Sequence, residues 1–369
     1  MKIGDLRVKR YVRQRPGAPP DEVMIVEVET DDGATGKGYV AAGGANAATS
    51  LHLLRGALRD AVLGQNPLLN DQIWSRTFAI ASQAGSRQLA RSCVAGIDFA
   101  LWDLKGRLLN VPVSDLFGNR RERIPTYANA AHVYPPEEVA ETALGYVKQG
   151  HKAVKIRCTL GLTDLKDSPL RVRLTREAVG PDVKIMVDVN GSWDTDIALQ
   201  QLRFWEPYNV YWLEEPVPPD DIAGYVRVRE RAGATYIVGG ERHVGVGEFR
   251  QLIEKRAVDM VQPNAGGNGG ITEWLKIYNL AVDHDVTVSP HNLQTVHIHM
   301  AAGLPKVKWI EYLLPDNTIG VDSFRNQLLR FPPIQEEVTA EGVFLRPPEK
   351  PGLYFELDEA LAEQTAVAE

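Results

Sequence analysis

Acidic side chains recur at the ends of successive apolar segments in the middle of this chain. Asp188 ends the segment VKIMVD, Glu214 ends VYWLE, and Glu241 directly follows YIVGG. Neighbouring members are 26 and 27 positions apart, which suits one strand plus one helix. Three carboxylates at the ends of adjacent strands form an all-oxygen site for a hard cation, and Mg²⁺ suits such a site. We therefore predict that Asp188, Glu214 and Glu241 bind one Mg²⁺ ion.

Polar side chains also stand at the same level of the other segments. In the segment KAVKIRC, the period-two alternation of a strand places Lys155 and Arg157 on one face. Asn190 likewise shares a face with Asp188. Three later segments carry further polar side chains near their ends, namely Asn264, His291 and Glu311. We expect all these groups to converge on one mouth. The alternative is a buried acid cluster that is neutralised by Lys155 and Arg157 without a metal ion.

This spacing requires a scaffold that brings the ends of many strands together. From residue 123, short apolar segments alternate with amphipathic stretches such as 136–149 and 271–284. We expect strands at 123–129, 152–158, 183–190, 210–216, 235–241, 258–264, 286–290 and 309–313. Strands separated by helices pair in parallel, and eight such units favour an α/β barrel of the TIM type over an open sheet. Catalytic groups of such barrels lie at the carboxyl ends of the strands.

The segments on either side of the barrel follow other patterns. Residues 22–30 alternate as a half-buried strand, 35–40 resemble its hairpin partner, and 85–109 have the apolar spacing of a helix. The tail is rich in proline and charge before a short strand and an acidic helix. We predict an α+β capping domain over 1–122 and the barrel over 123–321. The segment 322–369 should return to the cap.

Composition limits the classes of function. The chain has 369 residues, of which 44% are hydrophobic and 24% charged, as in ordinary globular proteins. A formal charge of -7 argues against nucleic acid as a partner. The sequence has no apolar run near the roughly 20 residues of a membrane span, and residues 1–17 lack the apolar stretch of a signal peptide. We expect a cytoplasmic enzyme with no membrane partner.

Several strings together resemble the enolase superfamily, and within it the mandelate racemase-like group, also known for muconate lactonizing enzymes. They are SCVAGIDFALWDLKG, KIR, VDVNGSW, WLEEP, GGE, SPH and WIEYL. The resemblance implies a modified (β/α)₇β barrel under an α+β cap, with a small-molecule carboxylate as substrate and a homo-oligomeric assembly. It also implies that Mg²⁺ assists removal of the proton α to the substrate carboxylate, through an enediolate. By the same resemblance Glu311 donates a hydrogen bond to that carboxylate, and Asn190 contacts the substrate.

Two positions depart from the family's usual pattern. Arg157 stands where a lysine base is common, and a guanidinium is too basic to accept a proton efficiently near neutrality. Asn264 stands where an aspartate often pairs with the histidine of the seventh strand, here His291. Because racemisation needs a base on each face, these changes favour dehydration of a sugar acid to a 2-keto-3-deoxy acid. His291 would take the α-proton and then protonate the departing hydroxyl, with Lys155 as a neighbouring cation.

Two other readings of the function remain open. One is an isomerase, meaning a racemase, an epimerase or a cycloisomerase. The other is a catalytically quiet relative that binds a sugar acid or has a structural role.

Further residues could reach the mouth. His243 and His132 are candidates for substrate binding or for a spare acid or base. Loops at 13–22 and 41–50 are expected to select the substrate, with Arg13 and Arg15 as possible contacts, although solvated surface charge is the favoured reading for these two. His297 and His299 do not share a helix face, which argues against a metal pair.

Overall fold

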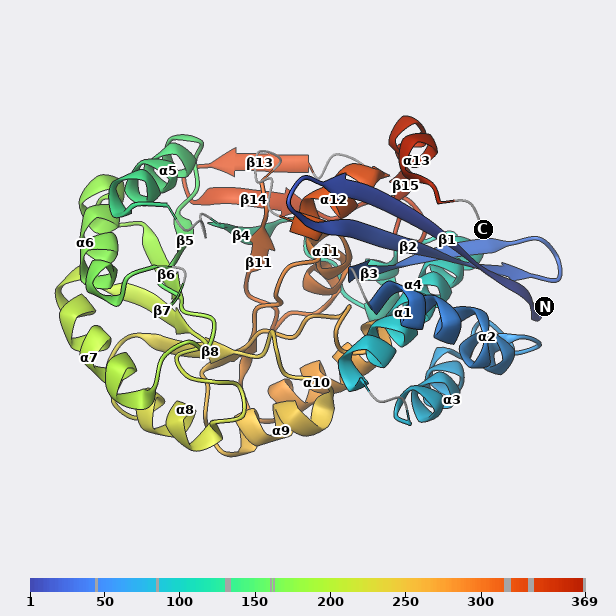
Figure 1. Ribbon diagram of the computed structural model, residues 1–369, viewed down its shortest axis with the longest axis horizontal. Helices are drawn as coiled ribbons and strands as arrows, with labels where there is room; N and C mark the ends of the chain where they lie inside the picture. Colours follow the sequence, from blue (N-terminus) through green and yellow to red (C-terminus); the bar gives the residue numbers. More distant parts are fainter. Residues whose placement is uncertain are drawn as a thin grey trace.

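The computed structural model describes residues 1–43, 46–83, 86–129, 134–159, 161, 163–314, 320–330 and 335–367. A ring of helices around short strands forms the barrel, and a cap lies at its side (Figure 1). Residue 1 and residue 367, the first and last described residues, both lie at the cap. No helix in these described ranges is long and apolar enough to span a membrane.

Within the described residues, eight parallel strands form the barrel, as the sequence predicts. They are β4 (Ile124–Asn129), β5 (Ala153–Arg157), β6 (Lys184–Asp188), β7 (Val210–Glu214), β8 (Tyr236–Gly239), β9 (Met260–Val261), β10 (Thr287–Val288) and β11 (Ile310–Tyr312). Strands β4 to β10 pair in chain order, and β11 pairs with β4. A parallel bridge between Val288 and Val307 joins the two ends of the sheet, which closes the barrel.

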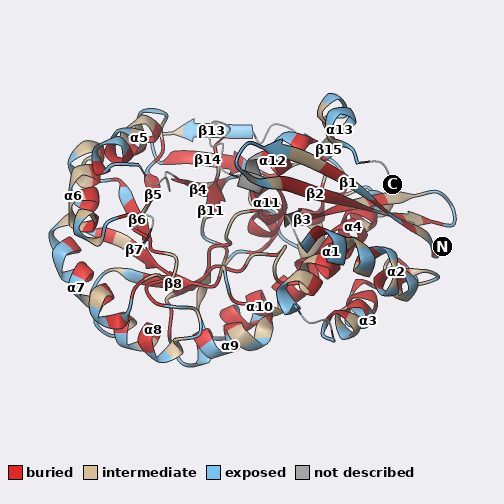
Figure 2. Ribbon diagram, viewed as in Figure 1, coloured by how far each residue is buried: buried red, intermediate tan, exposed pale blue. Residues whose placement is uncertain are grey.

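Seven helices alternate with these strands, which gives the expected (β/α)₇β order. They are α5 (Pro136–Lys148), α6 (Ser168–Val179), α7 (Thr195–Trp205), α8 (Ile222–Arg229), α9 (Val246–Glu254), α10 (Ile271–Asp283) and α11 (Gln294–Gly303). Their buried faces point to the strands and their exposed faces point outward (Figure 2). In α7, for example, the side chain of Asp194 accepts a hydrogen bond from the Ile197 amide and caps the helix, and Ala198 and Leu202 are buried at helical spacing.

The interior of the barrel is built in layers. Six consecutive strands each contribute one buried side chain to a single cluster, which contains Tyr127, Ala153, Met186, Trp212, Val238 and Met260. Alternation along a strand places the residue two positions later on the same face. The next layer toward the carboxyl ends therefore consists of polar side chains, and it contains Asn129, Lys155, Asp188 and Glu214. An apolar floor thus holds the polar layer at one level.

The cap contains a three-stranded antiparallel sheet and four helices. They are β1 (Ile3–Arg15), β2 (Ala18–Thr30), β3 (Thr35–Gly43), α1 (Asn46–Arg55), α2 (Ala57–Val62), α3 (Asn70–Ala81) and α4 (Arg87–Leu109). The expectation of a loop over 13–22 was wrong, because β1 and β2 pair almost to the turn at Pro16. Arg13 and Arg15 both form ion pairs with Asp21, at 2.7 and 3.4 Å, so both side chains are held within the hairpin. The expected loop 41–50 lies partly outside the described residues.

The C-terminal segment contacts both the cap and the barrel. Its elements are α12 (Gly320–Leu328), β12 (Leu329–Arg330), β13 (Gln335–Thr339), β14 (Gly342–Arg346), β15 (Glu356–Leu357) and α13 (Glu359–Thr365). Strand β14 pairs with β4 of the barrel. The Leu353 amide donates to the buried Asp103 of α4 at 2.8 Å, and Ala366 pairs with Tyr11. The domain limits at residues 122 and 321 stay predictions.

A buried carboxyl group in the cap joins it to the barrel. Asp98 of α4 accepts hydrogen bonds from the Thr272 amide at 3.0 Å and the Thr272 hydroxyl at 2.6 Å. The Trp102 indole donates to the same hydroxyl. Helix α10 begins beside Gly270, which has no side chain to cap it, so Asp98 supplies the cap from another domain. A Cβ at Gly270 would lie 2.3 Å from an Asp98 oxygen, so the contact requires glycine there.

This junction predicts a pH dependence of stability. Burial raises the pKa of Asp98 to about 7, whereas the unfolded value is about 3.9. The folded state then holds a proton that the unfolded state releases. The free energy of unfolding should therefore fall as pH rises from about 4 to about 7, by at most about 1.4 kcal/mol per pH unit. In Asp98→Asn this contribution should be absent. Urea denaturation of both proteins between pH 5 and 8 measures this contribution. If the free energy of unfolding changed equally with pH in the two proteins, Asp98 would not be the group that binds the proton.

Candidate active site

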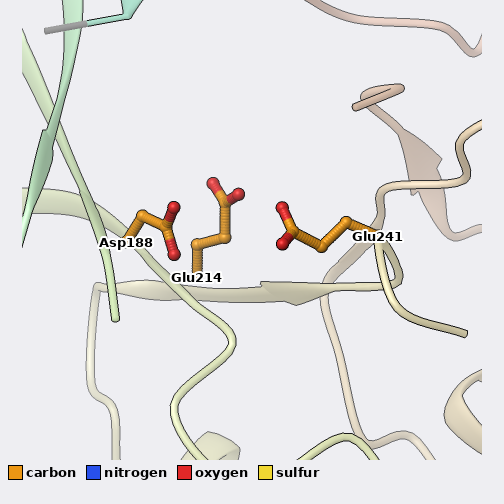
Figure 3. Close-up of side chains that lie close together, drawn as sticks. All are labelled: Asp188, Glu214 and Glu241. Atoms are coloured by element: carbon orange, nitrogen blue, oxygen red, sulfur yellow. The ribbon is translucent and has the colours of Figure 1, made fainter. Parts of the chain in front are cut away.

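Three carboxylates converge where the sequence predicts a cation site. The carboxylates of Asp188, Glu214 and Glu241 each offer an oxygen, and these oxygens lie within 4.8 Å of one another. Figure 3 shows the three side chains pointing toward a common space. Asp188 ends β6, Glu214 ends β7, and Glu241 follows the turn after β8. The parallel register pairs Asp188 with Glu214, which sets both carboxylates at one level.

Two cations lie beside this cluster. The Lys155 ammonium is 2.9 Å from Glu214 Oε1 and 2.8 Å from Glu311 Oε1, and its side chain is buried. Burial alone would lower the pKa of Lys155, but the two carboxylates raise it well above its usual value. The Arg157 guanidinium is 3.0 Å from Asp188 Oδ2. Both cations are therefore charged and held by acids.

The positive charge present does not balance the carboxylates. Glu214 Oε2 is buried without a hydrogen-bond partner among the described residues. Burial raises the pKa of Glu214, and the neighbouring carboxylates raise it further against the opposing effect of Lys155. A divalent cation would remove this repulsion, and hard, oxygen-only donors fit Mg²⁺. The donor set thus suits the ion that the sequence predicts.

Asn190 lies among the three carboxylates, as the sequence predicts. Its side-chain amide donates to Asp188 Oδ2 at 3.2 Å and to Glu241 Oε1 at 3.5 Å, and its oxygen accepts from the Thr159 hydroxyl. Its backbone has a φ of 48°, a left-handed conformation that asparagine tolerates better than most residues. Arg242 lies at the same mouth, 3.8 Å from Glu241, and donates to the Asn190 carbonyl.

Glu311 is buried and accepts hydrogen bonds. Its partners are Lys155, the side-chain amide of Asn129 at 2.7 Å and the backbone amide of Asn292 at 2.8 Å. Burial would raise its pKa, but Lys155 and His291 outweigh burial and lower it to about 2. An ionised Glu311 cannot donate to a substrate carboxylate, so the donating role stays a prediction that this arrangement does not favour.

His291 faces the carboxylates from the other side. Its Nε2 is 3.0 Å from Glu241 Oε2, and its Nδ1 is 3.3 Å from the Asn264 side-chain nitrogen. The Asn264 oxygen already accepts from the Gly266 and Gly267 amides, so the nitrogen must face the ring. Neutral His291 then accepts at Nδ1 and carries its proton on Nε2. Asn264 therefore selects the tautomer of His291.

The two other candidate histidines differ. His243 is buried, and its ring centre lies 6.0 Å from that of Phe249 and 6.4 Å from that of Tyr225. Among the described residues, no side-chain hydrogen bond or ion pair joins it to the carboxylate cluster, and its role in substrate binding stays a prediction. His132 lies outside the described residues.

Some residues of the site are absent from the sequence prediction. Asn129 ends β4, 26 positions before Lys155, and the same in-phase spacing could have identified it. Arg242 and His297 carry no comparable signal, because their contacts depend on how loops from different strands meet.

Comparison with known proteins agrees with this architecture. Residues 18–118 match the model of the mandelate racemase/muconate lactonizing enzyme N-terminal domain. Residues 138–361 match the model of the enolase C-terminal domain-like family.

Curated and solved relatives cover most of the chain. A 3,6-anhydro-α-L-galactonate cycloisomerase from Streptomyces coelicolor is 31% identical and covers 79% of this chain and 80% of its own. A D-galactonate dehydratase from Ralstonia nicotianae is 30% identical over 93% of this chain and 90% of its own. The structure of an L-talarate dehydratase from Polaromonas, complexed with Mg and L-glucarate, is 26% identical, with a TM-score of 0.86 over 100% and 99% of the chains. The chain belongs to the mandelate racemase/muconate lactonizing enzyme family of the enolase superfamily.

Proposed function

We propose that this protein is a hydro-lyase that dehydrates a sugar acid, an aldonate or an aldarate, to a 2-keto-3-deoxy acid. One observation carries the proposal. The cluster of Asp188, Glu214 and Glu241 is flanked by two ion-paired cations on one side and by His291 on the other. That arrangement offers one histidine able to exchange a proton, rather than a base on each face. The names of several relatives, which are dehydratases of sugar acids, support it.

We further propose one Mg²⁺ ion per site, held by Asp188, Glu214 and Glu241. The α-proton of a carboxylate is weakly acidic, and Mg²⁺ would stabilise the negative charge that develops on the substrate carboxylate. The solved relatives with bound magnesium support this choice of ion. A homo-oligomeric assembly and a cytoplasmic location stay predictions.

In the proposed reaction His291 acts through Nε2. It takes the α-proton, the electron pair of the C–H bond moves toward the carboxylate, and the 3-hydroxyl leaves as water with a proton from His291. The resulting enol then becomes the 2-keto acid. Lys155 and Arg157 contribute positive charge at the mouth. Because Asn264 favours a proton on Nε2, the tautomer of His291 that can accept the α-proton is the minor one. This limits the rate of proton removal.

A substrate screen tests the function. The purified protein with Mg²⁺ is incubated with a library of aldonic and aldaric acids, and 2-keto-3-deoxy product is read by semicarbazide absorbance. At least one acid should give an oxo product. If none does while Mg²⁺ binds, and solvent deuterium enters the α-carbon without loss of water, the protein is an isomerase. No reaction and no exchange would instead indicate the quiet relative.

The metal assignment has its own test. Glu241→Gln removes one of three charges from the site, and the dissociation constant for Mg²⁺ should rise by more than about tenfold. Isothermal titration calorimetry measures it. The matched control is Glu206→Gln, which changes an exposed glutamate outside the cluster and should leave Mg²⁺ binding unchanged. Equal affinity in the two variants would place the metal elsewhere.

The role of Asn264 gives a further prediction. In Asn264→Asp, one carboxylate oxygen can still accept from Gly266 and Gly267 while the other accepts a proton from His291 Nδ1. This stabilises the reactive tautomer by about 1 kcal/mol, so α-proton exchange with deuterated solvent should accelerate roughly fivefold.

In His291→Asn, exchange and dehydration should both fall by at least about 100-fold. Exchange that survives in His291→Asn would show that another residue takes the α-proton.

A further inference from the structure

A second histidine lies directly behind the pair formed by Asn264 and His291. His297 is on α11, which follows the loop that carries His291, and its side chain is fully buried. It touches none of the three proposed metal ligands through a described hydrogen bond or ion pair. Its ring instead sits between the loop after β9, which carries Asn264, and the loop after β10, which carries His291.

Both ring nitrogens of His297 are used. Nε2 lies 3.2 Å from the backbone nitrogen of Ala265, and Nδ1 lies 2.6 Å from the backbone oxygen of Asn292. A backbone amide can only donate and a carbonyl can only accept. The ring must therefore accept at Nε2 and donate from Nδ1. Burial lowers the pKa of His297 to about 3, so the ring stays neutral and keeps both bonds at ordinary pH.

The two backbone groups that it joins are neighbours of the reacting pair. Ala265 follows Asn264, and Asn292 follows His291. One rigid imidazole thus fixes the separation of the two loops immediately beside the 3.3 Å contact between Asn264 and His291 Nδ1. A shift of either loop would change that contact.

The loop after β10 needs such support. Asn292 and Leu293 have φ values of 54° and 45°, and consecutive left-handed residues other than glycine each cost on the order of 1 kcal/mol or more. Three polar groups of Asn292 are engaged. Its amide donates to Glu311 at 2.8 Å, its side-chain oxygen accepts from Arg325 at 3.1 Å, and its carbonyl accepts from His297. Without His297, the half-buried carbonyl of Asn292 would lose this donor in an already strained turn.

We propose that His297 is a positioning residue, a neutral clamp that joins the two loops and holds His291 in register with Asn264. The clamp itself is a property of the resting fold. The proposal rests on the proposed function only in that it assigns His291 a part in the reaction. The competing explanation is a core histidine that contributes to stability alone. If His297 is a positioning residue, its replacement displaces the His291 ring. If His297 contributes to stability alone, the His291 ring stays in place.

The chain offers a matched control. His299 lies on the same helix and is equally buried, but its Nε2 bonds to the Leu353 carbonyl at 3.1 Å, in the C-terminal segment. His297→Asn keeps a polar group near Nδ1 and loses the Ala265 contact, whereas His297→Gln can reach toward Ala265 and loses the Asn292 contact. His299→Asn should lower the stability of the protein through the same helix, without affecting the loop that carries Asn264 or the loop that carries His291.

For the positioning role, kcat should fall about 10- to 100-fold in both His297 variants, with KM and Mg²⁺ affinity changed less than about threefold. The loss from a misplaced His291 ring exceeds the gain of roughly fivefold that freer access to the reactive tautomer could give. His299→Asn should keep kcat. The second readout is independent of turnover. Burial would lower the pKa of His291 in the metal-free protein, but nearby Glu241 and Glu311 raise it, so the spectrum of the protein labelled with [¹⁵N]histidine is recorded at a pH high enough to keep that ring neutral. His291 should then be mainly the Nε2–H tautomer in the wild type and in His299→Asn, and a mixture in the His297 variants.

The outcomes separate the two proposals. Unchanged kcat and an unchanged His291 tautomer in folded His297 variants would overturn the clamp. If no sugar acid is turned over even by the wild type, the proposed function fails, and the NMR comparison alone decides the clamp. If the variants do not fold, the wild-type spectrum still decides: a proton on His297 Nε2 would contradict it, and one on Nδ1 would support it.

Discussion

The site depends on a shortage of positive charge. Asp188, Glu214, Glu241 and Glu311 meet at one mouth, and the buried cation among them, Lys155, is shared between two of them. Like charges this close repel, and burial weakens the screening that water would supply. The fold tolerates them because parallel strands fix the carboxylates from below and leave a common space above. The same repulsion that destabilises the cluster favours occupation by a divalent cation.

The rest of the molecule holds the edges of that mouth in place. The apolar floor sets the level of the strand ends, and Asp98 anchors the start of α10 from the cap. The loop before α10 carries Asn264, so the cap is connected to the residue that selects the tautomer of His291. The cap and the acid–base side of the mouth are therefore mechanically linked, although they belong to different parts of the chain.

Much of this could be predicted from the sequence because strands and helices repeat with fixed periods. The eight strands, the order of the barrel and the carboxylate cluster follow from spacing alone, and Asn129 shares that spacing. Other features depend on contacts between distant segments. The charges of Arg13 and Arg15 fit a loop as well as a strand, and only the pairing of β1 with β2 shows that both side chains form ion pairs with Asp21. The contacts of His297 depend on two loops whose shapes no local pattern encodes.

The return of the C-terminal segment has a consequence for how the protein is made. Leu353 bonds to Asp103 across 250 positions, and Arg325 supports the loop beside His291. Contacts this far apart in sequence close slowly and late in folding. A growing chain can acquire all three metal ligands well before Arg325 is synthesised. During that interval the chain contains the three ligands but lacks the segment that supports the loop beside His291. The order of synthesis thus places the metal ligands well before the last support of the catalytic mouth.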